Sequence, residues 1–362
     1  MNTRSHPFAS RPPVLALFQK RIDGDDALLH LASLRFKDCG LGTEFYSETP
    51  EELEKLLMFR PSTETPAAVH LKRGLDLFES GSPGMVLEFA ERFRDRIFGM
   101  IIHDQTEVIS HFDGYVSVLR KIDADLKSLG GSPYLFIEYA AGIEPESFTD
   151  LLKAIADLDH VSACIDIGHI GLRHIRDTFA RVHNGKDIFS IKSIDPEVQD
   201  AAGEIQMAVG SALDGVLQVI EKLGRLGKPI HFHLHDGHPL AQAGAFGISD
   251  HLSFLDKIPI PFEYRGRRHL DPMFGPSGLS RLVRKSLRLL GPERTSFSLE
   301  IHPTGGRLPL GDVSFLFHHW VDKGNAERMN FWLSVLCENQ KLVLKSCEKG
   351  ELSEAARKDD HL

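Results

Sequence analysis

Short apolar runs alternate with longer segments of helical periodicity along most of this chain. The runs are five to seven residues long, which is the length of strands rather than of helices. Eight strands that alternate with helices predict a (β/α)8 TIM barrel, because each parallel strand needs a helical crossover. The predicted strands lie at residues 14–19, 42–46, 67–72, 99–103, 134–139, 161–167, 230–235 and 296–301.

The segments between these runs place apolar residues at helical spacing. Thr49 followed by Pro50 is typical of a helix start. Two connections are longer than a barrel requires. Residues 169–229 hold two helical patterns, and residues 237–278 form a long loop that we expect to shape the substrate pocket. The clearest helical patterns lie at 50–58, 85–96, 108–129, 147–158, 204–226 and 279–290.

The barrel pattern divides the chain into four parts. We predict an N-terminal extension at residues 1–12 and a catalytic TIM barrel at 13–303. Residues 304–347 hold two further helical patterns, near 312–321 and 326–347, which we expect to pack on the barrel. Residues 348–362 are polar and are predicted to form a flexible tail.

Composition and charge narrow the class of protein. Apolar residues make up 42% and charged residues 26%, as in soluble globular proteins. The net charge of −9 makes nucleic acid an unlikely partner. Four scattered cysteines are typical of reduced thiols, and the longest apolar run near the N-terminus is too short for a signal peptide or a membrane span. We therefore expect a cytoplasmic protein without membrane association.

Four of the predicted strands end in a carboxylate or an imidazole. In a parallel barrel the carboxyl ends meet at one rim, so these side chains converge. Each alone has an ordinary structural interpretation, but together they predict a divalent metal site. The residues are Glu138, Asp166 with nearby His169, His233 and Glu300.

Alternating histidines in the seventh strand require a separate interpretation. His231, His233 and His235 alternate and are predicted to share one strand face. We expect His231 to be a core histidine with polar partners and His233 to be the metal ligand, with His235 next nearest.

These motifs resemble the xylose-isomerase-like TIM barrel superfamily, which includes sugar isomerases and epimerases and endonuclease IV-like proteins. The resemblance spans roughly residues 13 to 303 and rests on residues 136–142 (FIEYAAG), 165–169 (IDIGH), 233–236 (HLHD), 250–252 (DHL) and 299–300 (LE). It implies that Glu138, Asp166, His233 and Glu300 bind a shared metal. His169 would contact substrate in epimerases or bind a further metal in the endonuclease branch.

The same resemblance suggests an outer ring of residues. Endonuclease-like relatives use histidines at the third and fourth strands for a second metal, which here are His70 and His103. His235, Asp250 and His251 are further candidates for a metal or the substrate. The chain departs from both branches: Asp250 and His251 are adjacent rather than one residue apart, His103 is followed by Asp-Gln-Thr, and the arginine that epimerases carry after the strand-seven histidine is missing.

The leading hypothesis is a metal-dependent isomerase or epimerase of a small polyhydroxylated carbonyl compound. Glu138 and Glu300 would transfer the proton through an enediolate, and His169 would orient a substrate oxygen. Three carboxylates and one imidazole suit Mn²⁺, Co²⁺ or Mg²⁺, whereas recruitment of His70 and His103 would favour Zn²⁺ or Fe.

Two alternatives remain. One is an endonuclease IV-like hydrolase that uses several metals on a phosphate ester. The other is a non-catalytic metal-binding barrel. The predicted partner is a small carbohydrate-like molecule. A nucleic-acid substrate for the hydrolase is unlikely because of the net charge, and the resemblance suggests a homo-oligomer.

Overall fold

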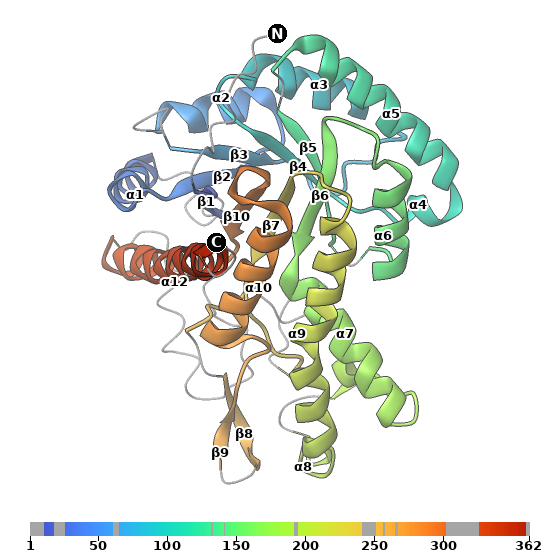
Figure 1. The fold of residues 1–362 in the computed structure, drawn as a ribbon, viewed down its shortest axis with the longest axis vertical. Coiled ribbons are helices and arrows are strands. Elements are labelled where there is room, and N and C mark those ends of the chain that lie inside the picture. The colour runs from blue at the N-terminus through green and yellow to red at the C-terminus, as the bar shows by residue number, and fades with distance from the viewer. Residues whose placement is uncertain are drawn as a thin grey trace. The chain divides into compact units, whose positions relative to one another are not determined.

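The computed structural model contains a closed barrel of eight parallel strands with alternating helices, a (β/α)8 TIM barrel (Figure 1). The strands follow one another around the barrel in the order β1-β10-β7-β6-β5-β4-β3-β2. They are β1 (Val14–Leu17), β2 (Gly42–Tyr46), β3 (Ala67–His70), β4 (Gly99–His103), β5 (Tyr134–Glu138), β6 (Val161–Asp166), β7 (Ile230–Leu234) and β10 (Thr295–Leu299). The structure describes residues 11–17, 26–60, 65–131, 133–140, 142–191, 195–240, 251–255, 258–264, 267–301 and 326–359.

All eight predicted strands are confirmed, with ends within two residues of the predicted ones. The helices are α1 (Asp26–Cys39), α2 (Pro50–Met58), α3 (Ser82–Phe93), α4 (Glu107–Ser110), α5 (Phe112–Leu129), α6 (Pro145–Ala154), α7 (Ile167–Val182), α8 (Glu197–Asp200), α9 (Ala202–Gly224), α10 (Gly275–Leu290) and α12 (Ala326–Asp359), with short 3-10 helices η2 (Ile188–Ser190) and η3 (Pro292–Arg294).

Helix α2 begins where the sequence predicts. The side chain of Thr49 accepts the N–H of Glu52 at 3.2 Å, and the Glu52 carboxylate in turn accepts the N–H of Glu48 at 2.7 Å. Pro50 occupies the first turn, where its missing N–H costs nothing. These local bonds satisfy donors that a helix start leaves unpaired.

The chain divides into two compact units. We call the first the barrel unit; it comprises Met1–Asp166, Val219–His233 and Leu289–Leu299. The second unit comprises Ile167–Gln218, Leu234–Arg288 and Glu300–Leu362. Within the barrel unit, helices α2, α3, α5 and α6 contact one another in that order beside the strands (Figure 1).

The interior of the barrel is filled by side chains from five strands. One buried cluster comprises Leu15, Ala68, Ile101, Phe136 and Cys164. A Cβ on Gly99 would lie 2.6 Å from the Phe136 ring, so the ring fits only because glycine stands there. This layer is a packed core rather than a pore, as in other TIM barrels, and leaves the carboxyl-end rim for the polar groups.

The segment between β7 and α10 differs from the prediction. We expected a loop at 237–278, but it contains a two-stranded antiparallel sheet, β8 (Ile258–Tyr264) with β9 (Arg267–Leu270). The sequence did not predict this strand because it contains Pro259 and Pro261, and proline has no backbone N–H to donate to a neighbouring strand. A two-stranded sheet has only edge strands, where proline is tolerated.

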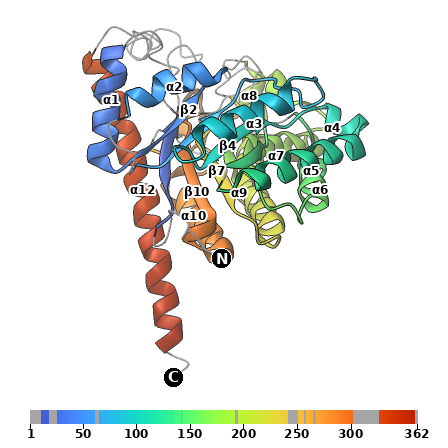
Figure 2. The same cartoon turned by 90° about the horizontal axis from the view of Figure 1, so that it is seen from above.

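The final helix is longer than expected. Helix α12 runs without interruption to Asp359, past residue 347 where the predicted helix ends (Figure 2). The predicted helix near 312–321 and the candidate Asp250 lie outside the described residues. How α12 packs on the barrel stays a prediction.

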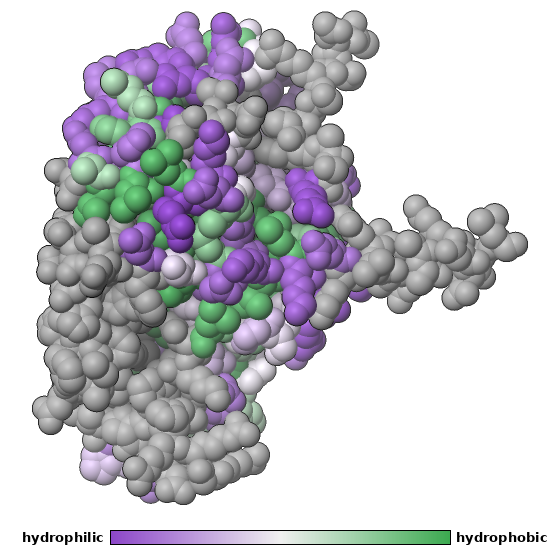
Figure 3. All heavy atoms as spheres, turned by 90° about the vertical axis from the view of Figure 1, so that its left-hand side faces the viewer, coloured by the Kyte–Doolittle hydropathy of each residue, from purple (hydrophilic) through white to green (hydrophobic). Residues whose placement is uncertain are grey.

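None of the helices in the described part of the chain has the length and apolar character needed to cross a membrane. Apolar and polar side chains intermingle on the face in Figure 3. The large apolar residues that are exposed sit on separate elements; examples are Leu34, Met58 and Ile109. All four cysteines are free thiols, as predicted.

Candidate metal centre

The strand register of the barrel unit brings four of the predicted residues together in pairs. His103 at the end of β4 is in register with Glu138 at the end of β5. Asp166 at the end of β6 is in register with His233 on β7. Neighbouring residues of parallel strands point to the same side, so each pair presents a carboxylate beside an imidazole.

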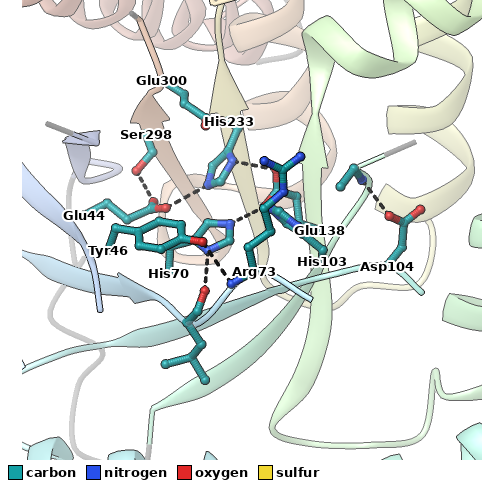
Figure 4. A network of polar contacts seen from close by, with 12 residues as sticks. Glu44, Tyr46, His70, Arg73, His103, Asp104, Glu138, His233, Ser298 and Glu300 are labelled. Carbon is teal, nitrogen blue, oxygen red and sulfur yellow. Dashed lines mark hydrogen bonds and ion pairs between the residues drawn. The ribbon is translucent and has the colours of Figure 1, made fainter. Parts of the chain in front are cut away.

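Glu138 lies at the centre of this arrangement (Figure 4). Its Oε2 is 2.7 Å from His70 Nε2 and 3.6 Å from His103 Nε2. Its Oε1 is 3.1 Å from His233 Nδ1. The two oxygens of one carboxylate therefore face two separate sets of imidazoles.

Two groups of possible ligands share this carboxylate. Ligand atoms of His70, His103 and Glu138 lie within 4.8 Å of one another, and so do those of Glu138, Asp166 and His233. We call these five residues the rim group. All except His103 are 0 to 3% exposed. Carboxylates this deeply buried are costly without a cation, so this donor set fits divalent metal ions.

The charge state of Glu138 suits this role. Burial alone would raise the pKa of its carboxyl, but the neighbouring imidazoles, led by that of His233, outweigh burial. They hold the pKa of Glu138 well below its usual range. The residue is therefore a carboxylate and an acceptor at neutral pH.

The outer nitrogens of two rim histidines are fixed by acceptors. His70 Nδ1 is 3.0 Å from the carbonyl oxygen of Leu71, and His233 Nε2 is 3.0 Å from Glu44 Oε1. In this structure the other nitrogen of each ring faces a Glu138 oxygen and donates a hydrogen bond to that carboxylate. With the outer nitrogen beside its acceptor, the nitrogen that faces Glu138 is the one that could bind a metal ion once it releases its proton.

Glu44 is a site residue that sequence reasoning missed. It lies on β2 and is fully buried. Its Oε2 is 2.9 Å from His231 Nε2 and also accepts a hydrogen bond from Ser298. Burial would raise its pKa, but the imidazoles of His233 and His231 hold the pKa of Glu44 well below its usual range. The available signal was a carboxylate in the middle of an otherwise uncharged strand, Gly42–Tyr46.

His231 behaves as the core histidine that we expected. It is fully buried, and its Nδ1 is 2.7 Å from the Ser296 hydroxyl. With Cys164 and His233 it forms another close group. Burial raises the pKa of the Cys164 thiol, which stays protonated and is a poor ligand. His231 instead supports Glu44.

Asp104 organises the loop that follows Glu138. Its carboxylate accepts the N–H groups of Ala140 at 2.9 Å, Gly142 at 3.2 Å and Ile143 at 3.1 Å. Burial outweighs these bonds and raises the pKa of Asp104 to about 6. Asp104 thus fixes the backbone beside the metal-facing end of β5.

Tyr46 and Arg73 lie on the β2–β3 side of the rim group. The Tyr46 ring stacks on His70, with centroids 5.1 Å apart and an interplanar angle of 13°. Its hydroxyl accepts the N–H of Arg73 at 2.9 Å. In Figure 4 the exposed Arg73 side chain extends from this loop toward the rim group. The arrangement places a positive charge on this side of the rim group.

The second unit contains its own group of histidines. Ligand atoms of His169, His235 and His251 lie within 4.8 Å of one another. We call these three residues the imidazole cluster. The rings of His235 and His251 are stacked, with centroids 4.3 Å apart. Strand β7 ends at Leu234, so His235 lies beyond the strand on which we placed it.

His235 is held in the opposite sense to the rim histidines. Its Nδ1 accepts the backbone N–H of His251 at 2.9 Å. The carbonyl oxygen of Asp236 is also near Nδ1, at 3.2 Å. Because a backbone N–H is always a donor, Nδ1 acts as the acceptor for His251. This bond favours the tautomer with the proton on Nε2, and in that tautomer Nε2 is a hydrogen-bond donor rather than a metal ligand.

Gly168 makes room for the His235 ring. A Cβ on Gly168 would lie 1.9 Å from Cε1 and 2.3 Å from Nδ1 of His235. The residue between Ile167 and His169 must therefore be glycine. This explains the glycine in the IDIGH motif by close packing of an imidazole.

Glu300 immediately follows β10, at the carboxyl end of the barrel strand. In the second unit its Oε1 is 3.2 Å from His251 Nε2, and its N–H donates to the Leu234 carbonyl at 3.1 Å. Asp236 plays a backbone role there, because its carboxylate accepts the N–H groups of Gly237, Phe274 and Gly275. It thereby caps the start of α10.

Comparison with known proteins adds no assignment. No protein-family model and no curated protein matches the chain. The fold and the buried groups that could hold a metal ion are consistent with a metal-dependent enzyme. The chemistry of the rim group is the basis for proposing a reaction.

Proposed function

We propose that the chain is a hydrolase of phosphate esters that uses two divalent cations, with Glu138 as the carboxylate shared between them. The observation that carries this proposal is the division of the Glu138 oxygens: Oε2 faces His70 and His103, whereas Oε1 faces His233. A carboxylate with ligands on both sides is the arrangement that a two-metal centre requires.

The residues divide into two ligand sets. His70, His103 and Glu138 would hold one cation, and Glu138, Asp166 and His233 would hold the other. When bound, the two cations activate water and neutralise the charge of the ester. Imidazole-rich ligands favour Zn²⁺ or Fe over Mg²⁺.

The surrounding residues suit this reaction. Glu44 and the carbonyl of Leu71 orient the His233 and His70 rings, and Asp104 fixes the loop after Glu138. Arg73 supplies a positive charge for an anionic substrate. The chain's own charge of −9 favours a small phosphate ester over nucleic acid.

A second candidate is the isomerase or epimerase of the xylose-isomerase-like superfamily. The observation that favours it is the strand order: β5, which ends in Glu138, and β10, which precedes Glu300, are separated by β6 and β7 around the barrel. Carboxylates from distant strands could give and take a proton on two sides of a substrate. One cation held by Asp166 and His233 would then suffice.

Metal content separates the two functions. Elemental analysis of protein loaded with Zn²⁺ should give at least two equivalents, and His70→Ala and His103→Ala should each remove one. The wild type should hydrolyse p-nitrophenyl phosphate. One equivalent that survives both substitutions, with exchange of a sugar's α-proton into deuterated solvent, would instead establish the isomerase.

A further inference from the structure

The C-terminal helix α12, which belongs to the second unit, carries one fully buried side-chain amide. Asn339 is 0% exposed. Its Oδ1 accepts the backbone N–H of Phe254 at 3.1 Å, and its Nδ2 donates to the Ser253 hydroxyl at 3.0 Å and to the Val335 carbonyl at 2.8 Å. The amide is thus bonded both to its own helix and to the segment at 251–255.

That segment carries His251 in a conformation that needs support. The φ angle of His251 is 64°, in the left-handed region that residues other than glycine rarely adopt. Directly after it, Leu252 forms a pair of backbone hydrogen bonds with Asp236, at 2.8 and 2.9 Å. The next two residues, Ser253 and Phe254, are hydrogen-bonded to Asn339. A strained residue persists when its surroundings determine it in this way.

The backbone of His251 in turn sets the state of His235. Its N–H donates to His235 Nδ1 at 2.9 Å, which keeps the ring proton on Nε2. The His251 side chain points its Nε2 to Glu300, 3.2 Å away. A shift of the segment would release both contacts together.

We infer that Asn339 is a positioning residue of the imidazole cluster: through Ser253 and Phe254, helix α12 fixes the His251 backbone and thereby the tautomer of His235. The C-terminal helix, which a (β/α)8 barrel does not require, would then hold the imidazole cluster in place. This inference does not depend on the proposed function, which uses the rim group.

The experiment uses full-length protein treated with EDTA, so that metal binding plays no part. Asn339→Leu has nearly the same volume but neither hydrogen bond to the segment. Val343→Ala is the matched control, because Val343 is a fully buried residue one turn along α12 whose side chain carries no polar group. Ser253→Ala removes one bond only and covers the possibility that Asn339→Leu does not fold.

Two readouts test the inference. Amide hydrogen exchange at residues 251–255 should accelerate about tenfold in Asn339→Leu, and less in Ser253→Ala, since each lost bond contributes modestly. The ¹⁵N spectrum of the His235 ring, identified by its loss in His235→Gln, should change from the Nε2–H tautomer to a mixture. Val343→Ala should change neither.

The inference is overturned if Asn339→Leu and Ser253→Ala keep the wild-type exchange and ring spectrum, or if Val343→Ala alters them equally. Failure of the proposed function gives a different result. In that case the wild type binds no Zn²⁺, while the effects of Asn339→Leu on the metal-free protein are still present.

Discussion

The rim group and the imidazole cluster both contain histidines, but the ring nitrogens of these histidines have different partners. In the rim group, the outer nitrogens of His70 and His233 lie beside acceptor oxygens, and the other nitrogen of each ring faces Glu138. In the imidazole cluster, His235 accepts a backbone N–H and keeps its proton on Nε2. Closeness of three imidazoles is therefore insufficient evidence for a metal site, because the partner of the far nitrogen decides what the near nitrogen can do.

The two groups also differ in what holds them. Rim residues stand on strands or at their ends, and the ladder register places them. All three cluster residues lie outside the barrel strands, and the positions of His235 and His251 depend on Gly168, Asp236 and Asn339. We accordingly expect substitutions at the rim to affect metal binding and substitutions around the cluster to affect stability and local order.

The largest effect should come from Glu138→Gln. The amide keeps the size of the side chain but loses the charge that both ligand sets share. Zn²⁺ affinity should fall by more than about 100-fold, since even outer partners of ligands contribute about 10- to 100-fold. Competition with a chromophoric chelator measures it. If Glu138→Gln bound Zn²⁺ with near-wild-type affinity, Glu138 would not be the ligand that sets the rim group apart from the imidazole cluster.

Glu44→Gln should have the next largest effect. The variant keeps an amide of the same size near His233 Nε2 but loses the negative charge beside the ring. Zn²⁺ affinity should fall by about tenfold or more. Glu88→Gln, on the exposed side of α3, serves as the control and should bind as the wild type does. Equal affinity in the Glu44 and Glu88 variants would show that Glu44 only fills space.

Gly168→Ala tests the cluster. The new methyl group must displace the His235 ring, so we expect a loss of about 1–3 kcal/mol in the free energy of unfolding. Gly210→Ala in α9 has nothing within 4 Å of the added Cβ and should be stabilising by about 0.5–1 kcal/mol. Urea unfolding compares the two. Rim metal binding should survive both substitutions, and its loss in Gly168→Ala alone would mean that the groups are coupled.

Lys228→Met, just before β7, should affect neither group. Lys228 donates to the Ile155 carbonyl at 2.8 Å, and burial lowers its pKa to about 8. Between about pH 8 and the ordinary value of 10.5, the unfolded chain binds more protons than the folded one, so this residue makes the free energy of unfolding rise with pH.

That rise should be missing in the Lys228→Met variant, while its Zn²⁺ stoichiometry stays that of the wild type. Unfolding by urea at several values of pH, with metal analysis, provides the measurement. Loss of bound Zn²⁺ in Lys228→Met would show that the amino end of the barrel affects metal binding at the rim.

The sequence was sufficient to predict what local patterns determine. Period and length identified all eight strands, and a polar residue at the end of an apolar strand identified Glu138, Asp166 and His233. Glu44 was missed because its role depends on His231, which lies 187 residues away in the chain. Its own strand gives no sign of that contact.

Non-local contacts also explain the other omissions. Asn339 lies 85 residues from Phe254, and a single asparagine in a helical pattern is ordinarily a surface residue. The tautomer of His235 depends on the backbone of His251, which no residue pattern encodes. The β8–β9 sheet was missed because proline counts against a strand unless the strand is known to be an edge.

A two-metal hydrolase requires that Glu138 be shared by two cations. Anomalous X-ray diffraction from crystals grown with Zn²⁺ tests this most directly. We predict two anomalous peaks, one between Glu138 and the pair His70 and His103, and one between Glu138 and the pair Asp166 and His233. A single peak, or peaks that leave Glu138 uncoordinated, would contradict it.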